Sequence, residues 1–193
     1  NQLNFYEDYD QLTKQTPSFP DALIMVCNPS NPPDKPLLSP IQAEEIHKHL
    51  TERHFLVEDA AYGDVIFDPE KRKVTFQSEA SKGKKGSDAT VVHLRTPNKA
   101  IGTNGLRTGI AWISNQEAQA KISTYLTKHE TNHSKSPHHN MTYHALDTIY
   151  SDQEFLMVFL EVYNTEVVGK KEAINHYLKS KGIPPVDHQT GSF

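Results

Sequence analysis

LIMVCNPSNPP, at residues 23–33, and FLVEDAAY, at residues 55–62, are the two ends of the stretch that decides the fold. The run LIMVC is short, apolar and rich in β-forming residues, and a dense cluster of proline and asparagine follows it, so we expect a buried strand. The run FLV at 55–57 predicts a second strand. A helix-length segment separates the two strands, which predicts a β-α-β unit and therefore a parallel sheet.

The segment between the two strands carries clear signals for the start of a helix. Ser39 precedes Pro40, as an N-cap residue precedes a proline in the first turn. Gln42 stands at the third helical position, where it completes a capping box with Ser39. Apolar residues then recur at helical spacing, which predicts an amphipathic helix with one buried face: Ala43, Ile46 and Leu50.

Two more strands are predicted at 90–94 and 109–113, and the polar, lysine-rich segment 68–88 between the second and third strands predicts an exposed excursion. Beyond residue 115 the pattern predicts long helices at 116–129, about 141–150 and about 152–181. The last helix has an apolar stripe, and Gly182 is expected to end it. The expected fold class is α/β, with a mostly parallel sheet and flanking helices, followed by long helices. The stripe consists of Phe155, Val158, Phe159, Val162, Val167 and Ile174.

The composition limits the classes of function. The chain has 193 residues, 36% of them hydrophobic, with a net charge of −4, which indicates a globular domain without the basic surface that nucleic acid requires. No apolar run is long enough to cross a membrane, and no secretory signal segment is visible. Cys27 is the only cysteine, which favours a reducing, cytoplasmic location. His129 and His133 have helical spacing, but a helix-breaking stretch follows, so we expect no metal site.

Polar side chains follow three of the predicted strands where each strand ends. They are Asn31, Asp59 and Lys99. Ligands of open parallel sheets bind at the carboxyl ends of the strands, so these three side chains could converge on one small molecule. Each residue by itself is equally consistent with an ordinary turn.

Together these residues form a specific pattern. NPSNP at 28–32 is followed by DAAY at 59–62, then by Lys99 and by GLRTG at 105–109. Asp59 follows Asn31 by 28 positions (59 − 31), and Arg107 follows Lys99 by 8 (107 − 99). In order and spacing these four motifs resemble those of the class I and II aminotransferases, which are fold-type I enzymes that depend on pyridoxal 5′-phosphate.

The resemblance implies a catalytic role for Lys99. Its amine would form the Schiff base with the cofactor and then, once released by an amino-acid substrate, act as the base that moves a proton. Asp59 would pair with the pyridine nitrogen of the cofactor. Asn31 and Tyr62 would hydrogen-bond to its phenolate oxygen.

The resemblance also implies a set of phosphate ligands. Arg107 would bind the cofactor phosphate through its guanidinium, with help from the hydroxyl of Thr96. Asn98 stands where the family usually has a serine, and we expect it to be a further phosphate contact. In this chain Pro33 and Asp34 replace the usual Thr-Gly after the Asn-Pro turn, which leaves substrate preference open.

By this resemblance, residues 1–150 belong to the cofactor-binding large domain, and 151–193 to a connecting helix and the start of a small domain. The family's glycine-containing phosphate loop, ring-stacking aromatic residue and substrate-binding arginine are expected outside this chain. The chain alone is therefore expected to be inactive, and the full-length protein is expected to be a homodimer.

The implied activity is the transfer of an amino group between an amino acid and a 2-oxo acid, in amino-acid metabolism. Two alternatives stay open. One is a lyase of the β-elimination type on the same scaffold, and the other is a non-catalytic ligand-sensing module that has kept the fold.

Overall fold

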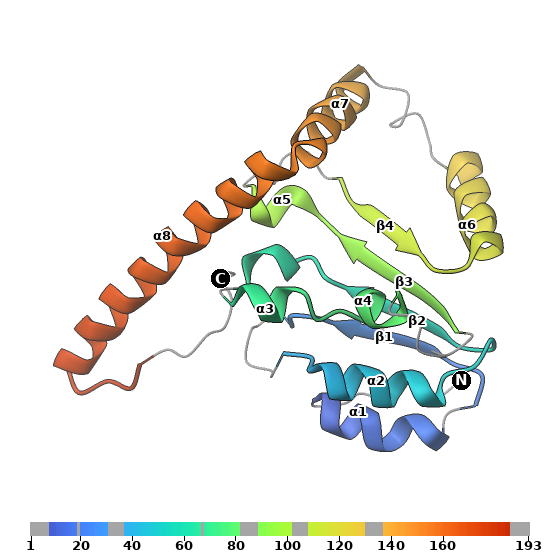
Figure 1. Cartoon of the computed structure of the whole chain (residues 1–193), viewed down its shortest axis with the longest axis horizontal. Helices are drawn as coiled ribbons and strands as arrows, with labels where there is room; N and C mark the ends of the chain where they lie inside the picture. Colours follow the sequence, from blue (N-terminus) through green and yellow to red (C-terminus); the bar gives the residue numbers. More distant parts are fainter. Residues whose placement is uncertain are drawn as a thin grey trace.

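A four-stranded sheet organises the protein. The computed structural model describes residues 8–18, 20–30, 37–66, 68–81, 89–101, 108–129 and 137–185. The strands lie in the order β1-β2-β3-β4, and the first three are parallel while the fourth is antiparallel to β3 (Figure 1). This arrangement confirms the α/β class and the mostly parallel sheet. The strands are β1 (Leu23–Cys27), β2 (Phe55–Asp59), β3 (Thr90–Arg95) and β4 (Ile110–Ile113).

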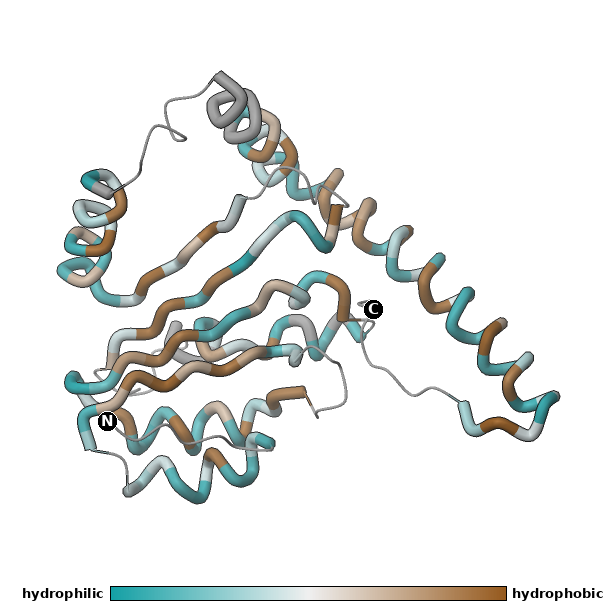
Figure 2. The backbone as a smooth tube through the Cα atoms, turned by 180° about the vertical axis from the view of Figure 1, so that it is seen from behind, coloured by the Kyte–Doolittle hydropathy of each residue, from teal (hydrophilic) through white to brown (hydrophobic). Residues whose placement is uncertain are grey.

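Three helices cover one face of the sheet: α1 (Tyr9–Gln15), α2 (Pro40–His49) and α4 (Phe76–Ser81) (Figure 1). Alternate residues of each strand point toward these helices, as the two-residue period of a strand requires. Figure 2 shows the resulting run of hydrophobic residues along the strands. The core that forms there includes Leu12, Ile24, Ile46, Leu56, Phe76 and Val91.

The start of α2 confirms the predicted capping box. The Ser39 hydroxyl accepts a hydrogen bond from the Gln42 amide at 3.2 Å, and the Gln42 side-chain oxygen accepts one from the Ser39 amide at 3.0 Å. Two otherwise unpaired backbone donors are satisfied in this way. The predicted core positions Ala43, Ile46 and Leu50 are all buried.

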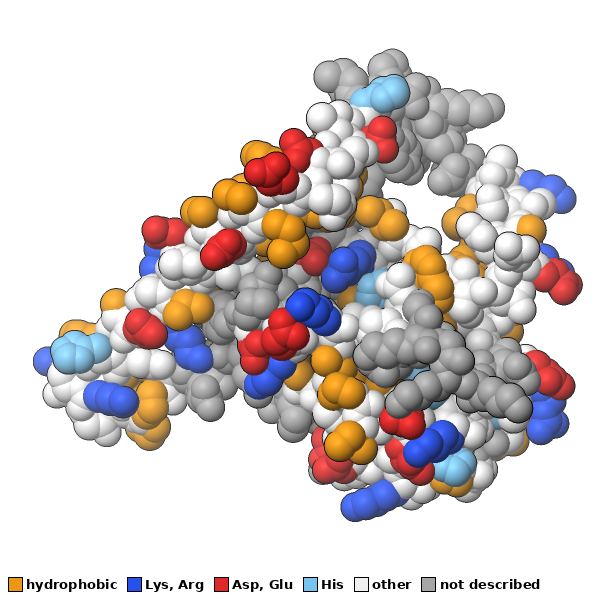
Figure 3. Space-filling model, viewed as in Figure 1, with side chains coloured by type: hydrophobic (Ala, Val, Ile, Leu, Met, Phe, Trp, Pro, Cys, Tyr) orange, Lys and Arg blue, Asp and Glu red, His pale blue; other side chains and the backbone are white. Residues whose placement is uncertain are grey.

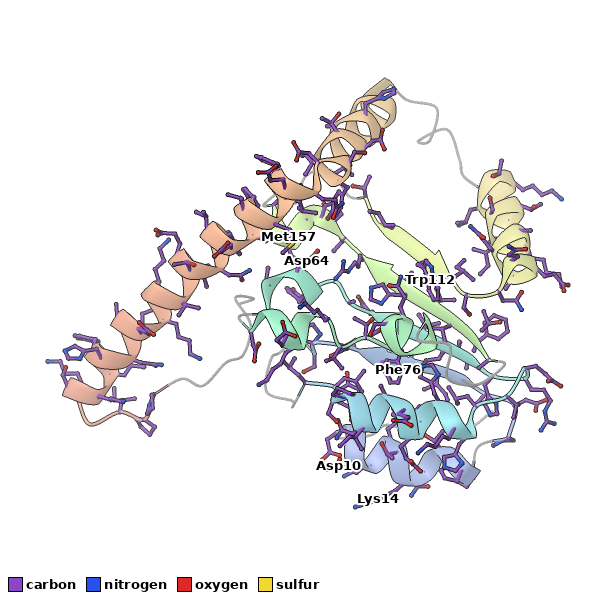
Figure 4. The ribbon with its side chains drawn as sticks, viewed as in Figure 1. Asp10, Lys14, Asp64, Phe76, Trp112 and Met157 are labelled. Atoms are coloured by element: carbon purple, nitrogen blue, oxygen red, sulfur yellow. The ribbon has the colours of Figure 1, made fainter. Side chains whose placement is uncertain are left out.

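The prediction that 68–88 is an exposed excursion was wrong for its central part. This segment contains α3 (Pro69–Arg72) and α4, and the Phe76 side chain is fully buried (Figure 4). Phe76 packs with its ring edge against His47 of α2, at 5.6 Å between the ring centroids. The surrounding lysines and glycines dominate the sequence pattern, so a single core aromatic residue did not stand out. Residues 82–88 lie outside the described part of the chain.

Helix α1, on the covered face of the sheet, was not predicted from the sequence. Asp8 caps it by accepting a hydrogen bond from the Gln11 amide at 2.9 Å.

The three helices predicted after residue 115 are confirmed, and the second begins at Pro137, a few residues earlier than expected. They are α6 (Gln116–His129), α7 (Pro137–Ser151) and α8 (Gln153–Ser180). The remaining short elements are η1 (Thr16–Ser18), η2 (Gly63–Val65) and α5 (Pro97–Ala100).

The long helix α8 ends where its sequence predicts. Gly182 adopts a positive φ of 71°, and the Ile183 amide donates to the Leu178 carbonyl at 3.0 Å, closing the helix with a left-handed turn. The apolar stripe of α8, however, is largely exposed here, including Phe155, Val158, Val162 and Ile174 (Figure 3). No helix in the described part of the chain is long and apolar enough to cross a membrane.

Candidate functional site

The candidate site lies at the carboxyl ends of β1, β2 and β3. In the sheet, Asp59 is the register partner of Cys27 on one side and of Leu94 on the other. The Asn28 amide donates to the Asp59 carbonyl at 2.9 Å, and the Ala60 amide donates to the Leu94 carbonyl at 2.9 Å. The backbone pairing therefore continues one residue past the ends of β1 and β2 and fixes the three strand ends relative to one another.

The Asp59 side chain shapes the turn that follows β2. One of its carboxylate oxygens accepts a hydrogen bond from the Ala61 amide at 3.0 Å, a local arrangement typical of aspartate at a turn. The Gly63 amide then donates to the Ala60 carbonyl at 2.9 Å, and η2 begins. The motif DAAY is thereby folded back on itself, which places Tyr62 beside the end of β3.

Lys99 lies on α5, a single helical turn directly after β3. Its ammonium nitrogen is 5.4 Å from the centroid of the Tyr62 ring, a cation–π distance. Residues 37 positions apart in the sequence (99 − 62) are thus in contact. The structure brings together Lys99 and Tyr62, two of the residues that the sequence motifs singled out.

The turn that carries Lys99 is held by Thr96. Its hydroxyl caps α5 by accepting from the Asn98 amide at 3.3 Å, and it donates to the Thr108 carbonyl at 2.8 Å. In this structure the hydroxyl proton of Thr96 is used within the protein, so the predicted contact of Thr96 with the phosphate requires this hydrogen bond to open and stays a prediction. This contact ties the Lys99 turn to the segment that enters β4.

Two buried polar atoms beside this turn have no protein partner. They are the side-chain oxygen of Asn98 and the hydroxyl of Thr108, in side chains that are more than nine-tenths buried. Buried polar groups nearly always have a hydrogen-bond partner, so each unpaired atom needs an explanation. Thr108 was not singled out in the sequence, although its place directly after Arg107 in the GLRTG motif was an available signal.

Two further predicted ligands, Asn31 and Arg107, lie outside the described residues. Their roles stay predictions. Ser30, which precedes Asn31, lies just after the carboxyl end of β1. Thr108, which follows Arg107, lies just before β4, the strand that pairs with β3.

The carboxylate of Asp59 influences the side chain next to it in the sheet. Partial burial and the negative charge of Asp59 raise the pKa of the Cys27 thiol, with burial the larger cause. A thiol in this environment keeps its proton to higher pH than a free cysteine does. The pKa of the Cys27 thiol therefore depends in part on the charge of Asp59.

The helix α8 is attached beside the same turn through a second polar cluster. Arg95, at the end of β3, pairs with Asp64 of η2 at 3.2 Å, and the Asn164 side chain of α8 donates to the Asp64 carbonyl at 3.4 Å. Figure 4 shows Asp64 near α8. Burial and the Asp64 carboxylate raise the pKa of Tyr150, against the opposing effect of Arg95. The turn that carries Tyr62 is therefore held by both β3 and α8.

Comparison with known proteins places this arrangement in a family. The family model described as aminotransferase class I and II matches residues 2–193. Among curated proteins, 1-aminocyclopropane-1-carboxylate synthase 11 of Arabidopsis thaliana is 27% identical over 176 residues, which are 88% of this chain and 35% of that protein. The chain thus spans about a third of the length of that relative.

Solved structures share the same fold at low sequence identity. The broad-specificity aminotransferase from Leishmania mexicana has a TM-score of 0.69 at 17% identity, covering 92% of this chain and 44% of that one. A pyridoxal-phosphate-bound putative aminotransferase from Clostridium difficile 630 has a TM-score of 0.68 at 14% identity, with coverage of 90% and 41%. A pyridoxal-phosphate-bound C–S lyase from Staphylococcus hominis has a TM-score of 0.62 at 18% identity, again with coverage of 90% and 41%.

The fold, the juxtaposed motif residues and the match over nearly the whole chain agree with one another. The chain belongs to the class I and II aminotransferases, a family of enzymes that depend on pyridoxal phosphate.

Proposed function

We propose that the full-length protein transfers an amino group between an amino acid and a 2-oxo acid, with pyridoxal 5′-phosphate attached at Lys99. The observation that carries the proposal is the contact between Lys99 and Tyr62 at the carboxyl edge of the sheet, beside Asp59. The amine of Lys99 and the phenol of Tyr62 come from two different motifs, and Asp59 belongs to the same motif as Tyr62, at the end of β2.

The residues present fit this cofactor. The unpaired hydroxyl of Thr108 can donate to an anion, and the unpaired side-chain oxygen of Asn98 can accept from a donor on a ligand or a water molecule. Asn98 lies on α5, the turn that carries Lys99, and Thr108 is tied to the cap of this turn through its carbonyl. A buried pair of polar groups without protein partners is accounted for when a polar ligand lies against them.

When bound, the cofactor would supply an electron-accepting ring and an aldehyde that condenses with amines. In the proposal, Lys99 holds the cofactor and, when its amine is released, moves the proton at the substrate α-carbon. Asp59 holds a proton at the ring nitrogen, and Tyr62 donates a hydrogen bond to the ring oxygen. Thr96 keeps Lys99 in place through its bond to the Thr108 carbonyl, while Asn31 and Arg107 complete the proposed ligand set.

Other expectations are part of the same proposal. The full-length protein acts in amino-acid metabolism as a homodimer in the cytoplasm, and the single cysteine of this chain suits a reducing compartment. Residues 1–150 form the cofactor-binding part, and residues 151–193 lead into a small domain.

The test uses the full-length protein and its Lys99→Ala variant. We expect pyridoxal phosphate to give a covalent adduct with the wild-type protein that borohydride makes permanent, with mass spectrometry locating it on the peptide that contains Lys99. The variant is expected to form no such adduct, while Lys121→Ala, an exposed lysine on α6, is expected to behave like wild type. An adduct of undiminished yield in Lys99→Ala would overturn the assignment.

A lyase is the second candidate, because the chain is similar to a 1-aminocyclopropane-1-carboxylate synthase and to C–S lyases as well as to aminotransferases. A shared fold does not decide the reaction. Incubation of the loaded full-length protein with an amino acid separates the two. Pyridoxamine phosphate and the matching 2-oxo acid support transfer, whereas ammonia with a 2-oxo acid that lacks the side-chain leaving group supports elimination.

Cofactor binding without either product would favour the third reading, a non-catalytic sensing module.

A further inference from the structure

A buried carboxylate lies one residue before Asp59 and has no part in the proposed chemistry. Glu58 is fully buried, on the face of the sheet that α1, α2 and α4 cover. It shares this face with Leu56, two residues earlier, so a charged residue occupies a position where the strand pattern calls for an apolar one. Glutamate is almost never fully buried unless it is paired.

The Glu58 carboxyl group contacts polar groups from three separate parts of the chain. One oxygen accepts from the Asn28 side-chain amide at 2.9 Å, and the other from the Phe76 backbone amide at 3.0 Å. The second oxygen also lies 2.8 Å from Nδ1 of His93, which is nearly fully buried. Glu58 thus links the residue after β1, the first residue of α4, and β3.

The orientation of the Asn28 amide is fixed by its other contacts. Its nitrogen also donates to the Val74 carbonyl at 3.2 Å, and its oxygen accepts from the Leu38 amide at 3.4 Å. If the side-chain amide were rotated by 180°, its oxygen would face the Val74 carbonyl and its nitrogen would face the Leu38 amide. Asn28 therefore needs an acceptor at position 58.

The same residue is joined to Asp59 through the backbone, because the Asn28 amide donates to the Asp59 carbonyl. Asn28 is thus held at two points, by the side chain of Glu58 and by the backbone of Asp59. Burying an ion pair or a charged network adds little net stability compared with an apolar replacement. A role in fixing the geometry of this corner explains the network better than a role in stability.

We propose that Glu58 is a positioning residue of the cofactor site: through Asn28 it holds the turn after β1 against the Asp59 end of β2. The proposal rests on the proposed function, since it concerns the placement of Asp59 and of the turn that leads to Asn31. Glu58 does not touch the cofactor and acts only through these neighbours.

The first variant is Glu58→Gln in the full-length protein. Glutamine has one acceptor oxygen instead of two, so its amide group opposes a donor, either that of Asn28 or those of Phe76 and His93. We expect the affinity for pyridoxal phosphate to fall about tenfold, because the turn after β1 and the Asp59 end of β2 are no longer held in the arrangement that binds the cofactor. In the cofactor-free protein we expect faster hydrogen–deuterium exchange at the backbone amide of Asn28, which donates to the Asp59 carbonyl.

The matched control is Val91→Ala, on the same face of β3 and two residues before His93. It removes buried methyl groups from the core without touching the network. We expect it to lower the denaturation midpoint while leaving the cofactor affinity within about twofold of wild type.

A polarity swap provides the rescue. Asn28→Asp alone sets two carboxylates against each other and is expected to weaken cofactor binding. Combined with Glu58→Gln it restores a donor–acceptor pair of reversed polarity between positions 28 and 58, although the Val74 carbonyl still faces an acceptor. The double variant is therefore expected to bind more tightly than Asn28→Asp alone.

The outcomes separate the two proposals. Wild-type protein that does not bind pyridoxal phosphate at Lys99 overturns the proposed function. Wild-type protein that binds, together with a Glu58→Gln variant of equal affinity, overturns the positioning role alone. A loss of affinity in Val91→Ala as large as that in Glu58→Gln also overturns that role, as does a double variant that binds no more tightly than Asn28→Asp.

Discussion

Single residues at the carboxyl edge of the sheet influence one another through charge as well as through hydrogen bonds. Asp59 and Cys27 are register partners on neighbouring strands, and the carboxylate adds to the effect of burial in raising the pKa of the thiol. The folded protein keeps this proton to higher pH than the unfolded chain. The contribution of Cys27 to stability is therefore complete below the ordinary thiol pKa and is lost as the pH rises above it.

This coupling gives a prediction for Asp59→Asn. Removing the negative charge should lower the pKa of Cys27 toward its ordinary value, while the contribution of burial remains. The pH dependence of alkylation by iodoacetamide should consequently shift to lower pH. Asp21→Asn, an exposed carboxylate before β1 that pairs with Arg53, is the control and should leave the profile in place. A profile that does not move in Asp59→Asn would contradict the assigned coupling.

At the scale of elements, α2 shows how local sequence is joined to packing. The capping box at Ser39 and Gln42 defines where the helix begins, and the Gln42 side-chain nitrogen also donates to the Asp10 carboxylate of α1 at 2.6 Å. The cap therefore orients a residue that joins two helices. Both helices lie on the face of the sheet that contains Glu58.

The corresponding prediction concerns Ser39→Ala. Losing the side-chain acceptor leaves the Gln42 amide unpaired, and we expect the free energy of unfolding to fall by about 1 kcal/mol. Ser123→Ala, at an exposed position inside α6, should change it by less than about 0.5 kcal/mol. Urea denaturation of both variants provides the measurement. A Ser39→Ala variant with the same free energy of unfolding as wild type would contradict a stabilising role for the cap.

In the molecule as a whole, burial is concentrated on one face of the sheet. Ile24, Leu56 and Val91 lie within the core beneath the helices, whereas Leu23 and Met25 of β1 are 66% and 70% exposed on the opposite face. The apolar stripe of α8 is exposed as well (Figure 3). Among the described residues, the largest share of the stability therefore comes from the core between the sheet and α1, α2 and α4.

Two isoleucines of the same helix test this distribution. Ile46 of α2 is fully buried, and Ile41 is 79% exposed. Ile46→Ala should reduce the free energy of unfolding by about 2–5 kcal/mol, because it removes buried apolar atoms and leaves a cavity. Ile41→Ala should change it by less than about 0.5 kcal/mol. Equal losses in the two variants would contradict the assignment of the core to this face.

Much of the fold was predictable from local patterns. The strands at 23–27 and 55–59, the cap of α2 and the glycine at the end of α8 follow from propensity and from the geometry of helix ends. The buried Phe76 was missed because one apolar residue among lysines and glycines has no period to reveal it. The burial of Glu58 was also missed, although a glutamate on the inward face of an apolar strand was a usable signal.

The sequence by itself determined the order and spacing of the motifs, and with them the family, because strand ends, turns and reactive residue types are local properties of the chain. Only the tertiary structure decided that Lys99 contacts Tyr62, and that Glu58, Asn28 and His93 share one buried network. These contacts join residues 30 to 37 positions apart (58 − 28, 93 − 58 and 99 − 62). Their formation depends on strand register and on which face each side chain takes, and both are fixed by the packing of the whole sheet.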